Sequence, residues 1–375
     1  MKIGILTLPL HTNYGGILQA YALQTVLERM GHEVVVINRN FHLKKYPPLW
    51  RFPLSLTKRC IRKYLFRQNV DIFSEYHQNK TYKTISQYTQ RFINQHIHTL
   101  TINELEELNK KDFDCIVVGS DQVWRKKYFT YHYATTIDNA YLAFANKWKV
   151  KKIAYAASFG TEDWEYSVED TNKCKKLISL FDNVSVREKD GLKLCKEKFN
   201  MNVVQSLDPT LLLNQSDYLT LLDADKSTHR KGNLFTYILD MTPEKDALVS
   251  FFSEKMGYVP FEVTDINKDV KSGIRIIPKV EKWIRCFYDA EVIFTDSFHA
   301  CVFSIIFRKQ FYVYGNVDRG LSRFSSLFEV LGVGDRFVLN STDITRMKPI
   351  DYDTVYQYLG ELRNESFEYL NRSLN

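Results

Sequence analysis

The first forty residues follow the order strand, glycine-containing loop, helix and strand, and this order restricts the fold more than any other part of the chain. Residues 2–8 are almost entirely apolar, as in a buried strand of a parallel sheet. Gly15 and Gly16 follow, and residues 17–30 then carry apolar side chains at helical spacing. The next strand begins within residues 33–38. This succession predicts an α/β fold in which helices cover both faces of a parallel sheet, the doubly wound or Rossmann-like arrangement.

The loop that precedes the first helix is a candidate binding site. Glycines allow the backbone to approach a ligand closely, and free N–H groups at a helix start favour anions. We therefore predict that Asn13, Gly15 and Gly16 bind an anion or an acceptor substrate; the alternative is that they only shape a tight turn. His11 is a candidate second acid/base group, with a plain loop residue as the favoured interpretation. The loop lacks the G-x-G-x-x-G spacing, and no acidic residue ends the second strand, so no dinucleotide cofactor is expected.

The chain of 375 residues is too long for one hydrophobic core, so two domains are expected. An N-terminal Rossmann-like domain is predicted over residues 1–215, with a basic aromatic insertion at about 42–100 that is expected to hold short helices. A second Rossmann-like domain is predicted over residues 230–345, after a polar bridge. The last residues, 350–375, are predicted to form a C-terminal helix.

Strand-like segments recur through both expected domains. They lie within residues 114–124, 152–160, 183–187 and 203–208 in the first half and within 234–239, 258–263, 291–294 and 310–314 in the second, with a further strand and helix expected in 272–286. Ligands of open parallel sheets gather beyond the carboxyl ends of the strands. Asp121 follows one of these strands, and it is predicted to contact an anion or acceptor, or else to cap the following turn.

The segment from Thr295 to His299 joins a short apolar strand to an apolar helix. A helix that begins there leaves backbone N–H groups unpaired, and these groups and the helix dipole favour a bound anion. His299 is expected in the first helical turn, where an imidazole can donate or accept a proton near neutral pH. The alternative is a core helix capped by Asp296, with a structural histidine.

Positive charge is concentrated in one part of the chain. The formal net charge is only +7, but the residues from His42 to Arg67 hold eight lysines and arginines and no acidic residue, with several aromatic residues between them. Such a segment suits an anionic membrane surface or a phosphorylated, lipid-linked substrate. Nucleic acid is not an expected partner, because no binding motif accompanies the segment. The alternative is a solvated basic loop.

Other features exclude whole classes of protein. No apolar stretch is long enough to span a membrane, and the first residues lack the features of a secretion signal. The six cysteines are dispersed without a C-x-x-C pair, which predicts reduced thiols in a cytoplasmic protein. No cluster of histidines and acids has metal-ligand spacing, so no metal is expected.

Six motifs in order resemble the polysaccharide pyruvyl transferases over roughly residues 3–315. They begin at Asn13 (Asn-Tyr-Gly-Gly), Val118 (Val-Gly-Ser-Asp-Gln), Ala156 (Ala-Ala-Ser-Phe-Gly), Ser185 (Ser-Val-Arg-Glu), Asp208 (Asp-Pro-Thr) and Thr295 (Thr-Asp-Ser-Phe-His). The resemblance implies two Rossmann-like domains that face a cleft, as in the glycosyltransferase B fold. It also implies that phosphoenolpyruvate donates a pyruvyl group to sugar hydroxyls of a capsule, exopolysaccharide or lipid-linked precursor, forming a pyruvate ketal. No cofactor is then needed.

The resemblance also suggests roles for individual residues. His299 takes the position of the motif histidine and is assigned the acid/base role. Arg187 would hold the carboxylate or phosphate of the donor, and the N–H groups near Phe298 and His299 would hold its other anionic end. Arg319 and Arg323 are further candidates for phosphate contacts. The alternative for Arg187 is an ordinary surface ion pair with Glu188 or Asp190.

Two other functions remain open from the sequence. One is a glycosyltransferase of the same fold that uses a nucleotide sugar, with Glu262 or Asp265 as a ribose-binding acid. The other is a catalytically idle protein that binds anionic glycans. A cytoplasmic enzyme, peripheral at the inner face of the membrane, is the location that the basic segment suggests.

Overall fold

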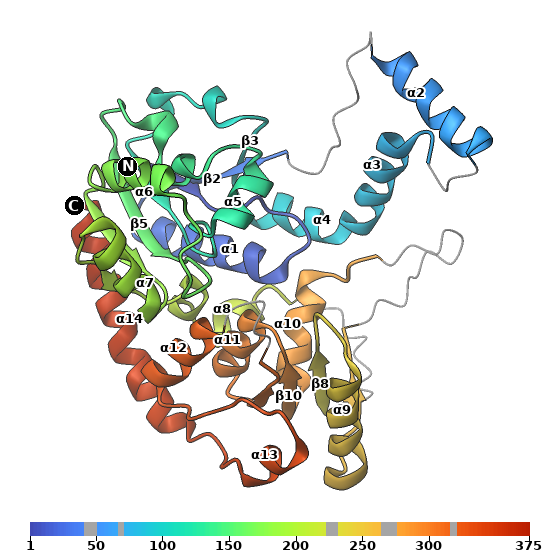
Figure 1. The fold of residues 1–375 in the computed structure, drawn as a ribbon. Coiled ribbons are helices and arrows are strands. Elements are labelled where there is room, and N and C mark those ends of the chain that lie inside the picture. Colours follow the sequence, from blue (N-terminus) through green and yellow to red (C-terminus); the bar gives the residue numbers. More distant parts are fainter. Residues whose placement is uncertain (41–50, 67–70, 223–231, 264–275, 316–320) are drawn as a thin grey trace.

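The computed structural model describes residues 1–40, 51–66, 71–222, 232–263, 276–315 and 321–375. In this part of the chain two separate parallel sheets are covered by helices (Figure 1). The larger sheet has seven strands in the order β3-β2-β1-β4-β5-β6-β7, and the smaller sheet has four in the order β11-β10-β8-β9. All pairings are parallel, which confirms the predicted α/β class.

The larger sheet and its helices come from the first 219 residues. Its strands are β1 Lys2–Leu6, β2 Glu33–Arg39, β3 Thr99–Ile102, β4 Cys115–Val118, β5 Lys151–Ala157, β6 Asn183–Val186 and β7 Val204–Gln205. The helices are α1 Tyr14–Arg29, α2 Phe52–Cys60, α3 Ser74–Ile85, α4 Gln87–His96, α5 Lys126–Tyr133, α6 Val168–Ile178, α7 Lys189–Leu194 and α8 Gln215–Leu219.

The smaller sheet lies in the second half of the chain. Its strands are β8 Leu234–Tyr237, β9 Pro260–Phe261, β10 Val292–Thr295 and β11 Gln310–Val313. The helices are α9 Pro243–Met256, α10 Val280–Asp289, α11 Phe298–Ile306, α12 Ser322–Leu331, α13 Ser341–Arg346 and α14 Tyr352–Leu374. Each sheet is therefore formed by strands from its own half of the chain, as expected for two Rossmann-like units.

The predicted strands are reproduced best in the sheet centres. At the edges they are shorter than predicted: the segment 203–208 contributes only β7, and the segment 258–263 contributes only β9. Pro260 has no N–H to donate to a ladder, which suits an edge position. The strand expected in 272–286 is not found in its described part, because residues 276–279 are irregular and α10 follows; residues 272–275 lie outside the described residues.

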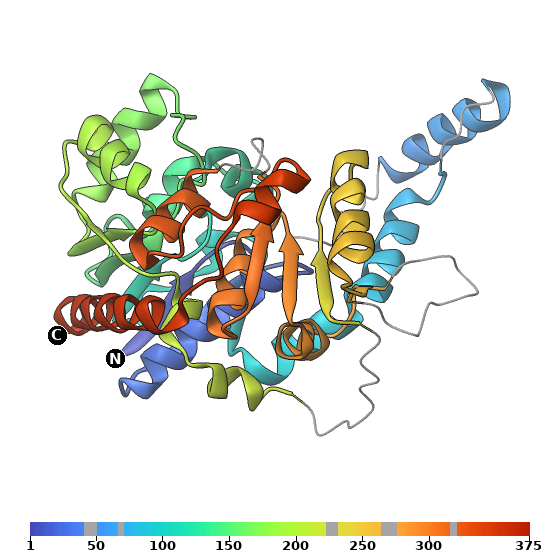
Figure 2. The same ribbon diagram turned by 90° about the horizontal axis from the view of Figure 1, so that it is seen from below.

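The basic insertion forms helices that leave the body of the molecule. After β2 the described chain continues as α2, a π-helical turn η1 (Ile61–Leu65), α3 and α4. Phe92 and Ile93 of α4 are fully buried, whereas α2 and η1 contain no buried residue. Both views show α2 and the start of α3 extending beyond the two sheets (Figures 1 and 2).

The two units are joined by a continuous core and by the last helix. One hydrophobic cluster includes side chains of α1, α10, α11, α12 and α14 together. Helix α14 begins beside the smaller unit and ends against the larger sheet, where the Tyr369 hydroxyl donates to the Ala154 carbonyl at 2.9 Å. The Ser366 hydroxyl accepts from Leu207 N–H at 3.1 Å. Helix α14 therefore fixes one unit against the other, at the middle of β5 and just beyond the end of β7.

Candidate active site

A buried ion pair forms the centre of the candidate site. Arg187 directly follows β6, and its Nη1 donates to Asp208 Oδ2, beyond the end of β7, at 2.7 Å. Their side chains are 3% and 1% exposed. Burial alone would lower the pKa of Arg187, but Asp208, Asp121 and Glu188 together raise it above its ordinary value. Arg187 is therefore a fixed buried cation. Of the alternative surface ion pair with Glu188 or Asp190, the Glu188 contact is present at 3.9 Å, but it is buried, and the hydrogen-bonded partner is Asp208.

Residues of the smaller unit contact this pair directly. The Arg187 guanidinium lies 4.8 Å from the centre of the Phe298 ring, in the first turn of α11. The next residue, His299, has its Nε2 3.7 Å from Asp208 Oδ2. Burial would raise the pKa of Asp208, but His299, Arg187 and a hydrogen bond from Thr210 hold it well below its usual range. The predicted convergence of His299 and Arg187 is thus present, with Asp208 between them.

The absence of a side chain at Gly15 makes room for the His299 ring between the two units. A Cβ atom added to Gly15 would lie 2.1 Å from His299 Nδ1, so the ring packs against the bare backbone at the start of α1. The N–H groups of Gly15 and Gly16 are 3.1 and 3.4 Å from Asn13 Oδ1, which caps the helix. These glycines contribute space, and their N–H groups are engaged within the loop. The alternative interpretation, that these residues shape a tight turn, therefore describes part of what they do.

Several buried nitrogens in this cluster have no hydrogen-bond partner in the described part of the chain. They are Arg187 Nε, Arg187 Nη2 and His299 Nε2, each fully shielded from solvent. The nearest carboxylates to the two arginine nitrogens are Glu188 Oε2 at 3.9 Å and Asp121 Oδ1 at 3.7 Å, beyond hydrogen-bond distance. A buried donor without a partner is destabilising, so each of these groups has bonding capacity for an oxygen-rich ligand.

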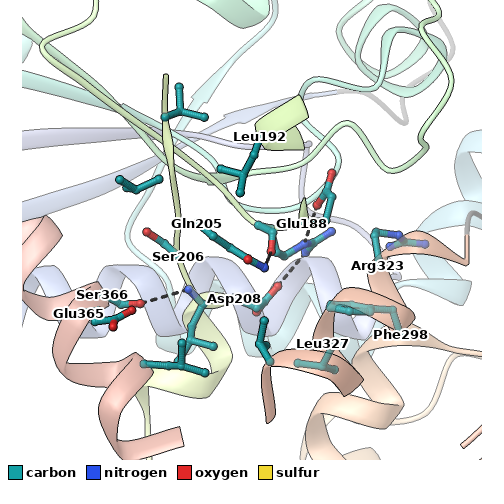
Figure 3. Close-up of a pocket in the computed structure, with 16 residues that line it drawn as sticks. Glu188, Leu192, Gln205, Ser206, Asp208, Phe298, Arg323, Leu327, Glu365 and Ser366 are labelled. Atoms are coloured by element: carbon teal, nitrogen blue, oxygen red, sulfur yellow. Dashed lines mark hydrogen bonds and ion pairs between the residues drawn. The ribbon is translucent and has the colours of Figure 1, made fainter. Parts of the chain in front are cut away.

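A cavity of ≈ 350 Å³ opens beside Arg187 and Asp208 (Figure 3). Glu188 and Asp208 line it from the larger unit, and Phe298 and Arg323 line it from the smaller one. The Arg323 Cζ lies 5.3 Å from the Phe298 ring centre. Burial, with a smaller contribution from Arg187, lowers the pKa of Arg323 to about 10. Two buried guanidinium groups on one aromatic ring form a wall that favours a small anion.

His299 is not among the described residues that line this cavity. It contacts Asp208 from the α1 side, where Gly15 lies. Ser297 is the N-cap of α11 and makes no side-chain cap hydrogen bond, so the first-turn N–H groups of that helix lack a side-chain cap. The expectation that these N–H groups hold an anion stays a prediction. Arg319 lies outside the described residues.

A second, more polar cavity of ≈ 230 Å³ lies at the carboxyl ends of β1 and β4. These strands are neighbours at the point where the strand order reverses, which is where open α/β sheets bind ligands. The predicted residues Asn13, Gly16 and Asp121 line it, together with His11, Gln122, Tyr128 and His132. Asp121 connects the two cavities, because its Oδ1 lies 3.7 Å from Arg187 Nη2.

Asp296 is not the helix cap that the alternative interpretation expected. Its carboxylate accepts from the N–H groups of Leu239 and Asp240 at 2.7 and 3.2 Å and from Lys245 Nζ at 2.7 Å. Both side chains of the Lys245–Asp296 pair are almost fully buried. This pair fixes the carboxyl ends of β8 and β10, and the N-cap position belongs to Ser297.

Two acidic residues of the site were not assigned a role from the sequence. Asp208 was recognised only as part of a motif, although a carboxylate at a strand end beside a strand ending in arginine is a usable signal. Glu188 Oε1 accepts from the Ser158 hydroxyl and from Phe159 N–H, at 3.0 and 2.8 Å. It therefore holds the small-residue loop after β5 next to Arg187.

Residues of different motifs therefore contact one another, since Arg187 and His299 both contact Asp208. A sequence model described as polysaccharide pyruvyl transferase matches residues 13–319. The chain belongs to the polysaccharide pyruvyl transferase family. Membership identifies this protein as a transferase. All six motifs lie within the matched range, whereas His11 and Arg323 lie outside it.

Comparison with solved structures finds similar proteins at low identity. UDP-GlcNAc 2-epimerase from Neisseria meningitidis, bound to UDP-GlcNAc, aligns with a TM-score of 0.49 and 12% identity, covering 99% of this chain and 100% of the epimerase. A glycosyltransferase from Rickettsia africae aligns with a TM-score of 0.47 and 11% identity, covering 100% of this chain and 95% of the other. No curated protein matches the sequence.

The described residues were also compared with the predictions about metal binding, cysteines and membrane-spanning helices. No group of three or more His, Cys, Asp or Glu side chains in the described ranges is arranged to hold a metal ion. All six cysteines are free thiols, and all but Cys60 are buried. No helix in the described ranges is both long and apolar enough to cross a membrane.

Proposed function

We propose that this protein transfers a pyruvyl group from phosphoenolpyruvate to two hydroxyls of one sugar residue, forming a cyclic pyruvate ketal and inorganic phosphate. The observation that carries the proposal is the set of buried donors on Arg187 and His299 that have no hydrogen-bond partner among the described residues. The Arg187 nitrogens adjoin a cavity in which Arg187 and Arg323 both contact Phe298, and His299 contacts Asp208 from the α1 side. A carboxylate with a phosphate ester is the kind of ligand that such a wall recognises.

The first step requires a proton at the methylene carbon of phosphoenolpyruvate. His299 is our candidate for this acid, and the ionised Asp208 carboxylate lies 3.7 Å from its Nε2. Protonation forms the methyl group and makes the adjacent carbon electrophilic. The first sugar hydroxyl then bonds to that carbon and releases its proton to a base. Arg187 and Arg323 stabilise the charge on the carboxylate and phosphate throughout.

The second step releases phosphate and closes the ring. The carbon–oxygen bond to phosphate breaks, and the bonding electrons leave with the phosphate, whose charge the two guanidinium groups stabilise. The second hydroxyl bonds to the same carbon and loses its proton. Of the two protons that the hydroxyls lose, one balances the proton delivered to the methylene and the other leaves with phosphate, so no redox partner or metal is needed.

The acceptor is best accommodated by the polar cavity at the ends of β1 and β4. Asp121 joins that cavity to Arg187, and Asn13, His11 and Tyr128 supply polar groups that suit sugar hydroxyls. We infer that the sugar belongs to a surface polysaccharide or its lipid-linked precursor, and that the enzyme works at the inner face of the membrane.

A nucleotide-sugar glycosyltransferase is supported less well. The crevice at the carboxyl ends of β8 and β10, where the strand order of the smaller sheet reverses, is held together by the Lys245–Asp296 pair. Glu262 directly follows the edge strand β9, away from that crevice, and Asp265 lies outside the described residues.

An assay with purified protein separates these functions. Incubation with phosphoenolpyruvate and a panel of galactosides and other diols should release inorganic phosphate and produce an acid-labile ketal, detected by mass spectrometry. Calorimetry should show binding of phosphoenolpyruvate and no binding of nucleoside diphosphates. The His299→Ala variant should lower kcat about 10²- to 10⁴-fold while the protein stays folded. Phosphoenolpyruvate binding without phosphate release on any acceptor would instead support a glycan-binding protein.

A further inference from the structure

The helical arm formed by residues 51–66, α2 and η1, exposes apolar side chains that the body of the molecule does not cover. Leu54, Tyr64, Leu65 and Phe66 are 67%, 72%, 74% and 63% exposed, and Ile61 is 45% exposed. Bulky apolar side chains gathered at one site on a surface mark a place of interaction. Both figures show α2 well away from the two sheets (Figures 1 and 2).

The arm has two distinct faces. Phe52, Ser55, Leu56, Arg59 and Cys60 are partly buried and recur at the spacing of one helix face. This inner face is fixed by Arg59, which forms a bidentate ion pair with Glu75 of α3. The hydrogen bonds from Arg59 lower the pKa of Glu75 to about 2, so the pair stays ionised at neutral pH. The outer face carries Leu54, Lys58, Ile61, Arg62 and Leu65, again at helical spacing, and all are exposed.

The charge on the arm has one sign. Residues 51–66 contain Arg51, Lys58, Arg59, Arg62 and Lys63 and no acidic residue. The nearby acids of α3 and the turn before it are engaged: Glu75 binds Arg59, and Asp71 lies 2.9 Å from His77 Nδ1. The outer face therefore combines cations with apolar side chains on an element that holds no acidic residue.

We propose that this arm docks the protein on an anionic lipid bilayer, with the outer face of α2 and η1 in the headgroup region. An acidic polymer would bind Lys58 and Lys63 but would leave Leu54, Ile61 and Leu65 in water. A bilayer with anionic headgroups satisfies both kinds of side chain at once, since the apolar groups enter the acyl boundary and the cations meet phosphates. Tyr64 suits the boundary itself, having an apolar ring and a polar hydroxyl.

The arm connects to the body through helices that are packed. Helix α4 follows α3 and buries Phe92 and Ile93. Arg91 of α4 is 3.1 Å from Glu281 of α10, in the smaller unit. A bilayer bound at the arm is therefore held at a fixed side of the molecule. This proposal goes beyond the proposed reaction and does not depend on it.

Vesicle sedimentation with the full-length protein tests the proposal without any activity measurement. The protein should sediment with vesicles of phosphatidylcholine and phosphatidylglycerol, and much less with phosphatidylcholine alone. Added salt should release it, because surface charge attraction is screened. The variant I61E/L65E should lose most of the bound fraction, and K58Q/K63Q should weaken partitioning about fivefold for each charge removed.

Matched variants on the body provide the controls. V168E/L339E also replaces two exposed apolar residues, and K193Q/K196Q also removes two exposed lysines. Both should bind like the unaltered protein, and all four variants should keep its melting temperature. Equal binding of the arm and body variants would overturn the proposal. So would binding of the unaltered protein to a soluble polyanion with no binding to anionic vesicles, which would assign the arm to an acidic polymer instead.

Discussion

Each of the two sheets has a buried ion pair at the carboxyl ends of its strands, and the two pairs differ in how completely their hydrogen bonds are satisfied. In the smaller unit, Asp296 accepts from Lys245 and two backbone N–H groups, and Lys245 also donates to the Asp240 carbonyl. In the larger unit, Arg187 donates to Asp208 through Nη1 alone, and its other buried nitrogens have no hydrogen-bond partner in the described chain, although Asp121 and Glu188 lie within ion-pair distance.

The difference separates a structural pair from a functional one. A buried pair whose bonds are all made within the protein stabilises the local backbone and has nothing left for a ligand. A buried cation with unused donors beside a cavity is destabilising until an anion arrives, and such groups concentrate at functional sites. We therefore expect substitutions at Lys245 to affect stability and substitutions at Arg187 to affect activity.

The largest expected effect is on stability, from Lys245→Met. The substitution leaves the Asp296 carboxylate buried without its cation, so the free energy of unfolding should fall by about 3–5 kcal/mol. Denaturant titration measures this free energy of unfolding. The double variant Lys245→Met/Asp296→Asn, which removes the charge but keeps an acceptor for the backbone N–H groups, should recover part of the loss. A full loss in the double variant would contradict the electrostatic explanation.

Arg187→Gln should act mainly on the reaction. It removes a fixed cation from the donor wall, and kcat/KM for phosphoenolpyruvate should fall about 10²- to 10³-fold. Stability should fall less than for Lys245→Met, because Asp208 keeps its hydrogen bonds from Thr210 and its contact with His299. Arg363→Gln, on α14, serves as the matched control for loss of an arginine, with kcat/KM expected to be unchanged. Similar turnover in both variants would remove Arg187 from the site.

Gly15→Ala tests the contact between the two units. The added methyl would overlap the His299 ring, so the ring or α1 must move, at about 1–3 kcal/mol in stability. Displacement of His299 should also lower kcat. Gly16→Ala is the control, since its nearest contact to an added Cβ is 3.6 Å, an ordinary separation. Equal behaviour of the two variants would show that the His299 ring does not depend on Gly15.

The smallest effect is a pH dependence of stability that comes from Asp208. Its pKa is depressed in the folded protein relative to the ordinary value of about 3.9. The stabilisation that ionised Asp208 contributes is thus fully present above a pH of about 3.9. It is lost as the pH falls from there towards the pKa of Asp208 in the folded protein. Thermal melts of the unaltered protein and Asp208→Asn should differ most at neutral pH and converge in acid. A constant difference at all pH values would exclude this origin.

The sequence predicted the elements better than it predicted the partners within the site. Strands β1, β2 and β10 and helices α1 and α14 follow from local apolar spacing, so their positions were predicted closely. The pairing of Arg187 with Asp208 depends on β6 and β7 being neighbours, which local spacing does not reveal.

The same limit explains the interpretation of Asp296 that was wrong. A carboxylate just before a helix is a common N-cap, and the sequence alone favours that role. Its actual cation, Lys245, lies 51 residues earlier in the chain and reaches it only because β8 and β10 pair. In contrast, His299 and Arg187 both belong to motifs of one family, and both contact Asp208; their roles toward a donor stay predictions.

The most direct test of the account is a crystal structure with phosphoenolpyruvate. An oxygen of the ligand is expected to accept from Arg187 Nε or Nη2, within the cavity lined by Phe298 and Arg323, and the methylene carbon is expected to face the side where His299 and Asp208 meet. Phosphoenolpyruvate bound at another place, with the Arg187 nitrogens still without a ligand contact, would contradict it.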